Sequence, residues 1–312
     1  MLAAAFVLGS NTMGMNRVRQ ETRTDEAVLK QKVSGQGVTI AILDRGIDWR
    51  HPDFITPKGT TRIKWLLDIT GQRFCDVNDP AAAEYSEAQI NTALFGGDPI
   101  HHRDAAGHGT VMAGLAAGNG RAGAGDKYRG MAPEADLIIV KVTSEGAIVH
   151  DGQPAEAPFQ GCIDDALDWL DDKMTQMGQP AVALINSGVQ WGPMDGISAV
   201  IRKIDQVFGL DRPDRVYASP SGDSGGGPNH AGGDDDNQNG VTVRLSNTSE
   251  ETAYMKTWYT GDMPTEITIG FDEVQRLVSL DRVALPSFNT DQAKRSIRGS
   301  PQAKTAASGF AP

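Results

Sequence analysis

The chain has 312 residues, of which 39% are hydrophobic and 22% charged, an ordinary range for a globular protein that buries one large core or two smaller ones. Its formal net charge is −11, and without a local basic patch this excludes nucleic acid as an expected partner. Two cysteines are too few for a disulfide framework or a thiolate zinc site.

Residues 1–34 are predicted to form an N-terminal extension. Residues 2–8 are apolar, but this run is far shorter than the roughly 20 residues of a membrane-spanning helix, and no Lys or Arg precedes it. It therefore predicts neither a membrane span nor a secretion signal. Residues 20–32 are charged and weakly helical, which would suit an extension or the end of a propeptide.

Strands and helices are predicted to alternate from residue 35 onward. Continuous apolar runs rich in β-branched residues are typical of strands buried on both faces. They occupy residues 38–43, 135–142, 181–185 and 215–218. Helical patterns lie between them at residues 109–117, 163–177 and 196–208. This alternation predicts an α/β domain over residues 35–230 with a doubly wound, mostly parallel sheet, whose active site would lie at the carboxyl ends of the strands.

The composition changes after about residue 231. A polar loop is followed by segments that alternate apolar and polar residues, as antiparallel strands do. These segments are residues 241–245, 253–259 and 266–270. Residues 231–288 are therefore predicted to be a β-rich insert. Residues 289–312 are rich in Lys, Arg, Ser and Ala with little apolar periodicity, and we expect a poorly ordered tail.

Two residues are candidates for catalysis. Asp44 ends the first predicted strand and precedes a tight turn at Gly46, which places a carboxylate at the mouth of the sheet. His108 stands between Gly107 and Gly109 where a helix begins, so that its ring would project from the helix start. Taken singly, each also has a structural explanation, as a turn-capping aspartate or a core histidine.

Together, GVTIAILDRGIDWRHPDF and GHGTVMAG resemble the aspartate and histidine motifs of subtilisin-like serine proteases (subtilases), in the same chain order. The stretch YRGMAPEADLIIVKV at residues 128–142 resembles the family's next strand. The resemblance covers about residues 35–230. It implies a serine endopeptidase that acts on peptides or proteins without an organic cofactor, and by analogy a secreted one.

The same resemblance assigns roles to individual residues. Asp44 would orient His108, and His108 would act as general base and then general acid. An extended substrate would pair with the chain after the strand at residues 181–185, in the region of Ser187, Gly188, Val189 and Gln190. Asp223 stands where the family has an oxyanion-binding asparagine, and an ionised carboxylate cannot donate a hydrogen bond.

The nucleophilic serine is the weakest part of the resemblance. The family motif Gly-Thr-Ser-x-Ala-x-Pro opens a long helix, and its counterpart here is TAASGFAP with Ser308. Alanines replace Gly and Thr, and no helix can follow within the chain. Some bacterial subtilases have a β jelly roll inserted before the nucleophile, and by that resemblance the true serine would lie beyond residue 312. We therefore expect a truncated chain without substantial protease activity. The alternative is a catalytically inactive pseudoprotease that binds a peptide or protein partner in the substrate groove.

Two further patterns are interpreted without a catalytic role. Asp48, His51 and Asp53 lie close together but match no defined metal loop, and Asp48 and Asp53 are predicted to cap a turn. No metal site is predicted, and calcium binding is not readable from the sequence. His101 and His102 have no partner at helical spacing and are interpreted as a loop pair.

Overall fold

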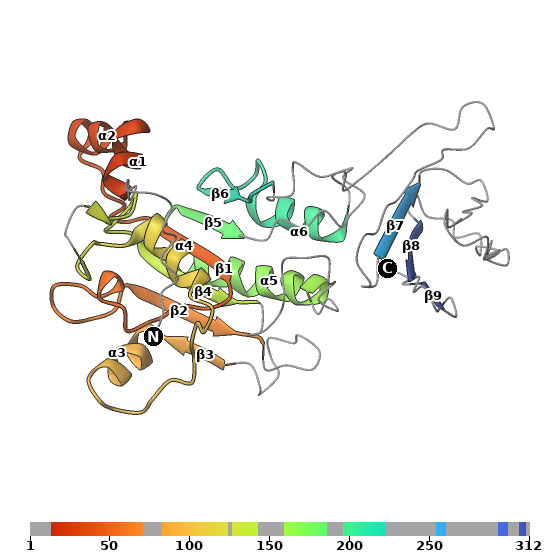
Figure 1. Ribbon diagram of the computed structural model, residues 1–312, viewed down its shortest axis with the longest axis horizontal. Coiled ribbons are helices and arrows are strands. Elements are labelled where there is room, and N and C mark those ends of the chain that lie inside the picture. The colour runs from red at the N-terminus through yellow and green to blue at the C-terminus, as the bar shows by residue number, and fades with distance from the viewer. Residues whose placement is uncertain are drawn as a thin grey trace, which may run out of the picture. The chain divides into compact units, whose positions relative to one another are not determined.

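A computed structural model describes residues 14–70, 83–123, 127–142, 163–185, 196 and 198–221, and the backbone alone at residues 159–162, 254–259, 293–298 and 306–309. The chain divides into two compact units (Figure 1). Unit 1 contains residues 1–147, 155–188 and 199–223. Unit 2 contains residues 148–154, 189–198 and 224–312.

Unit 1 is built on a six-stranded sheet in the order β3-β2-β4-β1-β5-β6. The strands are β1 (Thr39–Asp44), β2 (Ile63–Asp68), β3 (Ala83–Ser86), β4 (Asp136–Lys141), β5 (Ala181–Ile185) and β6 (Arg215–Ala218). All neighbouring strands pair in parallel except β3, which runs antiparallel to β2. The predicted α/β architecture with a mostly parallel sheet is confirmed.

Helices cover both faces of this sheet (Figure 1). They are α1 (Met15–Glu21), α2 (Thr24–Gln31), the short 3-10 helix η1 (Pro52–Phe54), α3 (Glu87–Leu94), α4 (His108–Ala117), α5 (Phe159–Met177) and α6 (Ala199–Phe208). Because side chains alternate along a strand, β1 contributes to two cores. Leu43 packs in the core that contains Leu167 of α5, whereas Ile42 packs in the core that contains Ala113 of α4.

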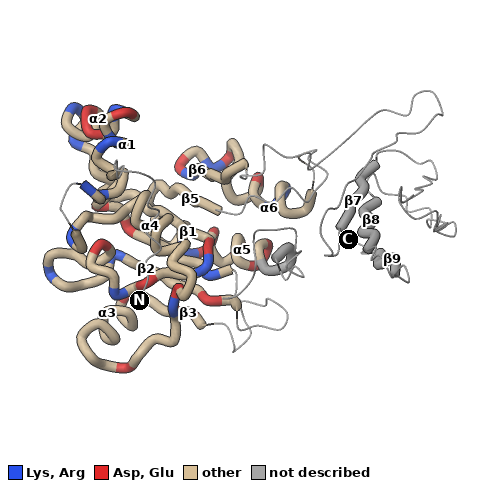
Figure 2. The backbone as a smooth tube through the Cα atoms, viewed as in Figure 1, with Lys and Arg blue, Asp and Glu red and all other residues tan. Residues whose placement is uncertain are grey.

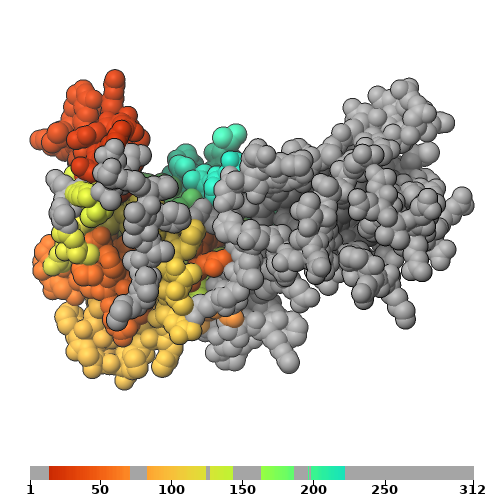
Figure 3. All heavy atoms as spheres, viewed as in Figure 1, coloured from red at the N-terminus to blue at the C-terminus, as the bar shows by residue number. Residues whose placement is uncertain are grey.

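The N-terminal helices α1 and α2 contact the rest of unit 1 through a buried arginine. The Arg19 side chain donates to Asp25 Oδ1 at 2.8 Å and to the carbonyl oxygen of Arg129. Arg129 is in turn 3.5 Å from Asp25 Oδ1. Both helices are visible on the outside of unit 1 (Figure 3). They carry charges of both signs, and over the described part of unit 1 positive and negative residues are interspersed in this view (Figure 2).

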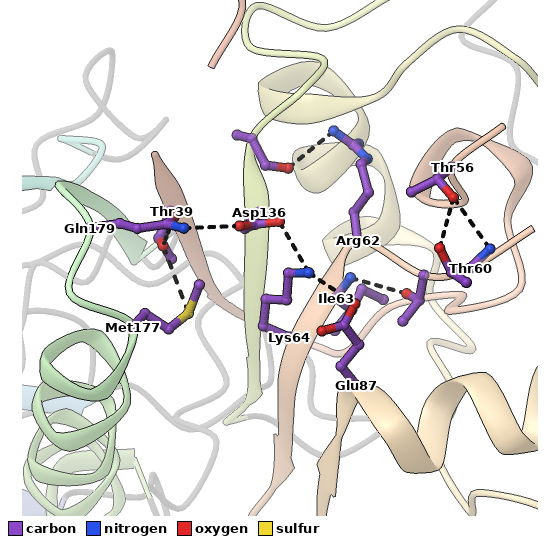
Figure 4. A network of polar contacts seen from close by, with 12 residues as sticks. Thr39, Thr56, Thr60, Arg62, Ile63, Lys64, Glu87, Asp136, Met177 and Gln179 are labelled. Atoms are coloured by element: carbon purple, nitrogen blue, oxygen red, sulfur yellow. Dashed lines mark hydrogen bonds and ion pairs between the residues drawn. The ribbon is translucent and has the colours of Figure 1, made fainter. Parts of the chain in front are cut away.

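Polar side chains join the amino ends of the central strands (Figure 4). Gln179 accepts from Thr39 Oγ1 at 3.2 Å and donates to Asp136 Oδ2 at 3.3 Å. Lys64 Nζ lies 3.4 Å from Asp136 Oδ1 and 2.9 Å from Glu87 Oε1. These contacts favour the observed register of β1, β4 and β2, and that register aligns the opposite ends of the three strands.

Unit 2 contains a three-stranded antiparallel sheet of β7 (Tyr254–Tyr259), β8 (Ala293–Arg298) and β9 (Ala306–Gly309). β7 falls in the segment predicted to form antiparallel strands, while residues 241–245 and 266–270 lie outside the described residues. β8 and β9 lie within residues 289–312, for which the sequence predicted a poorly ordered tail.

In the part of the chain that the structure describes, no helix is long and apolar enough to cross a bilayer.

Candidate active site

Three charged residues end neighbouring strands at the carboxyl edge of the sheet. Asp44 at the end of β1 is in register with Lys141 of β4, and Lys141 is in register with Asp68 at the end of β2. All three are largely removed from solvent, with side-chain exposures of 2%, 5% and 14%, respectively. Active sites of parallel sheets are expected at the carboxyl ends of the strands, where these three charged groups lie.

His108 opens α4 beside Asp44. Its Nδ1 lies 2.7 Å from Asp44 Oδ1, which also accepts from the backbone N–H of Arg45 at 2.7 Å. The His108 side chain is 46% exposed, so a buried carboxylate holds a ring that reaches solvent. The preceding Gly107 has φ 77°, a left-handed conformation that favours glycine and turns the chain into the helix. The geometric expectation for the pair is therefore met.

The carboxylate of Asp44 is in an unfavourable place for a charge. Burial raises the pKa of Asp44, although the hydrogen bonds from His108 and Arg45 oppose that rise. Among the described residues, its Oδ2 is buried without a hydrogen-bond partner. A folded-state pKa above the unfolded value means that stability present at low pH is lost as the pH rises through it. The ionised form thus lowers stability at neutral pH, as strained functional groups often do.

Two glycines set the distance between β1 and α4. Gly46 follows Asp44 with φ 114°, and its carbonyl oxygen lies against the first turn of α4. A Cβ atom on Gly109 would lie 2.0 Å from that oxygen and 3.2 Å from the Asp44 Cβ. Only glycine at position 109 allows this approach, and the approach brings His108 within reach of Asp44.

Asp104 organises the start of α4. Its Oδ1 accepts from the backbone N–H of Gly107 at 2.9 Å, and its Oδ2 accepts from the backbone N–H and the hydroxyl of Thr110 at 2.9 and 2.7 Å. The Thr110 hydroxyl accepts from the backbone N–H of Asp48 at 2.8 Å. This network ties the helix that carries His108 to the turn after Asp44. Asp104 was not among the residues predicted for the site, although a carboxylate just before a helix start is a recognisable capping signal.

Replacing Asp104 by alanine is expected to lower the free energy of unfolding by about 1–2 kcal/mol, the usual cost of losing a helix cap. Urea unfolding followed by circular dichroism measures the change. Asp98→Ala, at an exposed position in the preceding loop, is the matched control and should change stability by less than about 0.5 kcal/mol. Equal effects of the two substitutions would contradict the capping role.

His102 lies in a loop, as predicted, but its ring has partners that are distant in the sequence. Its ring is buried, with Nδ1 3.2 Å from Asp68 Oδ2 and Nε2 accepting from the backbone N–H of Ile47 at 3.1 Å. Asp68 lies 34 residues earlier and in a strand that the sequence analysis did not predict. Helical spacing could not reveal this partner, because the contact arises from the order of strands in the sheet.

Of the two residues predicted to cap a turn, Asp48 does so, whereas Asp53 accepts from a distant segment. Asp48 Oδ1 accepts from the backbone N–H of Arg50 at 3.2 Å, and His51 Nδ1 accepts from that of Asp53 at 3.4 Å. Asp53 Oδ1 accepts from the backbone N–H of Ala122 at 2.7 Å. Within the described ranges, no three His, Cys, Asp or Glu side chains converge as a metal site would require.

The other candidate residues are not brought to this site by the described structure. Ser187, Gly188, Val189, Gln190 and Asp223 lie outside the described residues. Ser308 lies in β9 of unit 2, where its backbone is in register with Ser296 of β8. It therefore belongs to a strand, and not to the start of a helix as the family motif requires.

Comparison with known proteins identifies the segment that contains Asp44 and His108. Residues 35–152 match the model of the subtilase family. Over 112 residues the chain is 36% identical to an intracellular serine protease of Paenibacillus polymyxa, covering 36% of this chain and 25% of that protein. Over 115 residues it is 34% identical to the serine protease AprX of Bacillus subtilis, covering 37% and 19%, respectively. The matches thus span a quarter or less of these relatives.

A solved structure supports the fold. The CspB protease of Clostridium perfringens superposes with a TM-score of 0.51 at 23% sequence identity, over 64% of this chain and 39% of that one. The superposition covers a larger share of the chain than the family match at residues 35–152 does.

Proposed function

We propose, on the premise that residues 35–152 are a subtilase segment, that this protein is a serine endopeptidase of the subtilisin type. The observation that carries the proposal is the 2.7 Å hydrogen bond between the His108 ring and the buried Asp44 carboxylate, at the carboxyl edge of a parallel sheet. The same edge of such sheets collects the reactive groups of many enzymes. Peptides or proteins would be the substrates.

The geometry suits His108 as a general base. Asp44 accepts from Nδ1, which fixes the tautomer in which Nε2 has the lone pair. Nε2 would take the proton of a serine hydroxyl as the serine oxygen attacks the peptide carbonyl, and it would return that proton to the leaving amine. In the second half of the reaction, Nε2 would take a proton from water as the water attacks the acyl-serine, and it would return that proton to the serine oxygen. Asp44 stabilises the imidazolium that forms in both halves, and no organic cofactor is required.

The serine and the substrate-binding residues belong to the proposal as well. Ser308 is the candidate nucleophile by its spacing to Pro312, and the segment Ser187–Gln190 is the candidate for pairing with an extended substrate. Asp223 at the oxyanion position would weaken stabilisation of the tetrahedral intermediate, because losing one such donor costs about 10²–10³ in turnover. Because Ser308 lies in a strand and Asp223 would weaken the oxyanion site, we expect the chain as given to have no substantial protease activity.

Reaction of the purified chain with a fluorophosphonate probe tests this function. We expect little labelling of the chain as given, whereas labelling of one serine that His108→Ala abolishes would show a working base, because the probe reacts with a serine only when a base activates it. Mass spectrometry locates the label, and loss of labelling in Ser308→Ala would establish Ser308 as the nucleophile. Labelling that persists in His108→Ala overturns the proposal. No labelling after prolonged incubation favours a protein that binds peptides without cleaving them.

A further inference from the structure

A second histidine–aspartate pair lies beside the first. Asp68 ends β2 as Asp44 ends β1, and its Oδ2 is 3.2 Å from Nδ1 of the fully buried His102 ring. Asp68 Oδ1 accepts from the backbone N–H and hydroxyl of Thr70 at 3.0 and 2.6 Å. Burial alone raises the pKa of Asp68, but the hydrogen bonds from His102 and Thr70 outweigh it and hold the pKa below its ordinary value. Asp68 is thus an ionised acceptor at neutral pH.

The contacts of the His102 ring define its protonation. Since the backbone N–H of Ile47 donates to Nε2 at 3.1 Å, Nε2 carries the lone pair and Nδ1 carries the proton that points to Asp68. The loop that holds the ring is fixed on two further sides. Trp49 Nε1 donates to the His102 carbonyl oxygen at 3.3 Å, and Lys141 Nζ donates to that of Arg103 at 2.9 Å.

The ring supports the turn that follows Asp44. A Cβ atom on Gly46 would lie 3.0 Å from His102 Nε2 and 2.7 Å from the Arg103 carbonyl oxygen. On its other side, the Gly46 carbonyl oxygen touches α4 at Gly109, next to His108. The turn of Gly46 and Ile47 is therefore held between the His102 ring and the helix that carries His108. A shift of the ring is transmitted to both members of the Asp44–His108 pair.

We propose that His102 is a positioning residue for the Asp44–His108 pair. It acts by accepting the Ile47 N–H, which fixes the turn between Asp44 and the first turn of α4. The inference rests on the proposed function for its catalytic meaning, but the contact it describes is structural and can be measured without substrate. It predicts that the geometry of the Asp44–His108 pair depends more on the acceptor at the Nε2 position of residue 102 than on the donor at the Nδ1 position.

Two substitutions separate these contacts. In His102→Gln, the side-chain oxygen can take the place of Nε2 and accept from Ile47, while the contact with Asp68 is lost. In His102→Asn, the shorter amide can donate to Asp68 but cannot reach Ile47. His101→Asn is the matched control, because His101 is the exposed neighbour in the same loop. Thermal unfolding of each full-length variant shows which proteins fold.

Proton NMR of the full chain reads the geometry of the pair directly. The parent should show a downfield proton on His108 Nδ1, assigned by its loss in His108→Ala. We expect that signal to be lost in His102→Asn and retained in His102→Gln and His101→Asn. A purely structural role for His102 would lower the melting temperature without moving the signal.

Several results would overturn the inference. They are an unchanged His108 signal in folded His102→Asn, equal loss of the signal in the Asn and Gln variants, or a parent spectrum without the signal. Because these spectra require neither a nucleophile nor a substrate, their failure leaves the fluorophosphonate result standing. A failed labelling experiment likewise leaves the spectra interpretable.

Discussion

Arg62→Met is expected to lower the free energy of unfolding by about 3–5 kcal/mol, because it removes a buried cation that binds four backbone carbonyls. The Arg62 guanidinium donates to the carbonyl oxygens of Asp53, Ala117, Pro133 and Ala135. Burial lowers the pKa of Arg62 to about 10, which still leaves it charged at neutral pH. Urea unfolding of the parent and the variant measures the difference.

The size of this effect follows from where the four carbonyls lie. Ala117 ends α4, Asp53 lies in η1, and Pro133 and Ala135 form the turn before β4. Each buried carbonyl left without a donor costs about 1–3 kcal/mol, and water can reach only some of them after the substitution. Arg62 thus joins η1, the end of α4 and the turn before β4.

A matched control shows whether the loss of stability comes from the burial of the arginine or from its hydrogen bonds to carbonyls alone. Arg121 is exposed, yet it also donates to two backbone carbonyls, those of Ile55 and Thr56. Arg121→Met should change the unfolding free energy by less than about 0.5 kcal/mol, since water replaces its hydrogen bonds. Arg62→Lys should fall between parent and Arg62→Met, because an ammonium group cannot span all four carbonyls. A loss below about 1 kcal/mol in Arg62→Met would refute the argument.

Most of the strands that the sequence predicted in unit 1 lie in the interior of its sheet, whereas β6 is an edge strand with an exposed Val216. β1, β4, β5 and β6 read as continuous apolar runs, and each was placed to within about two residues. β2 is equally central but was not predicted, because Lys64, which binds Asp136 and Glu87, interrupts its apolar run. β3 is a four-residue edge strand, too short for any periodicity. The helix α3 did carry a signal, since Ser86 and Gln89 form a capping box.

The same distinction applies to the site. Asp44 and His108 were found because each belongs to a local motif with flanking glycines. The roles of His102 and Asp68 depend on the strand order β2-β4-β1, which places their segments together only after folding. Local patterns identify groups that react, whereas residues that hold those groups in place are defined by tertiary contacts. This is why the partners of the buried His102 ring were not predicted.

Gly109→Ala is expected to separate His108 from Asp44. The added Cβ would lie 2.0 Å from the Gly46 carbonyl oxygen, and backbone on both sides leaves no flexible side chain to move away. Overpacking of this kind costs about 3 kcal/mol, which exceeds the gain of up to about 1 kcal/mol that alanine normally brings to a helix. We expect lower stability, loss of the downfield His108 proton and loss of any fluorophosphonate labelling.

Gly114→Ala in the same helix gives the opposite expectation. No described atom lies within 4 Å of a Cβ built on Gly114, so alanine there should raise the unfolding free energy by about 0.5–1 kcal/mol through helix propensity. The His108 proton and the labelling should be unchanged. The two substitutions make the same chemical change five residues apart in α4, so a difference in sign isolates the contact between Gly109 and Gly46. If Gly109→Ala is as stable as Gly114→Ala and keeps the His108 signal, the close approach of α4 to the Asp44 turn is not what positions His108.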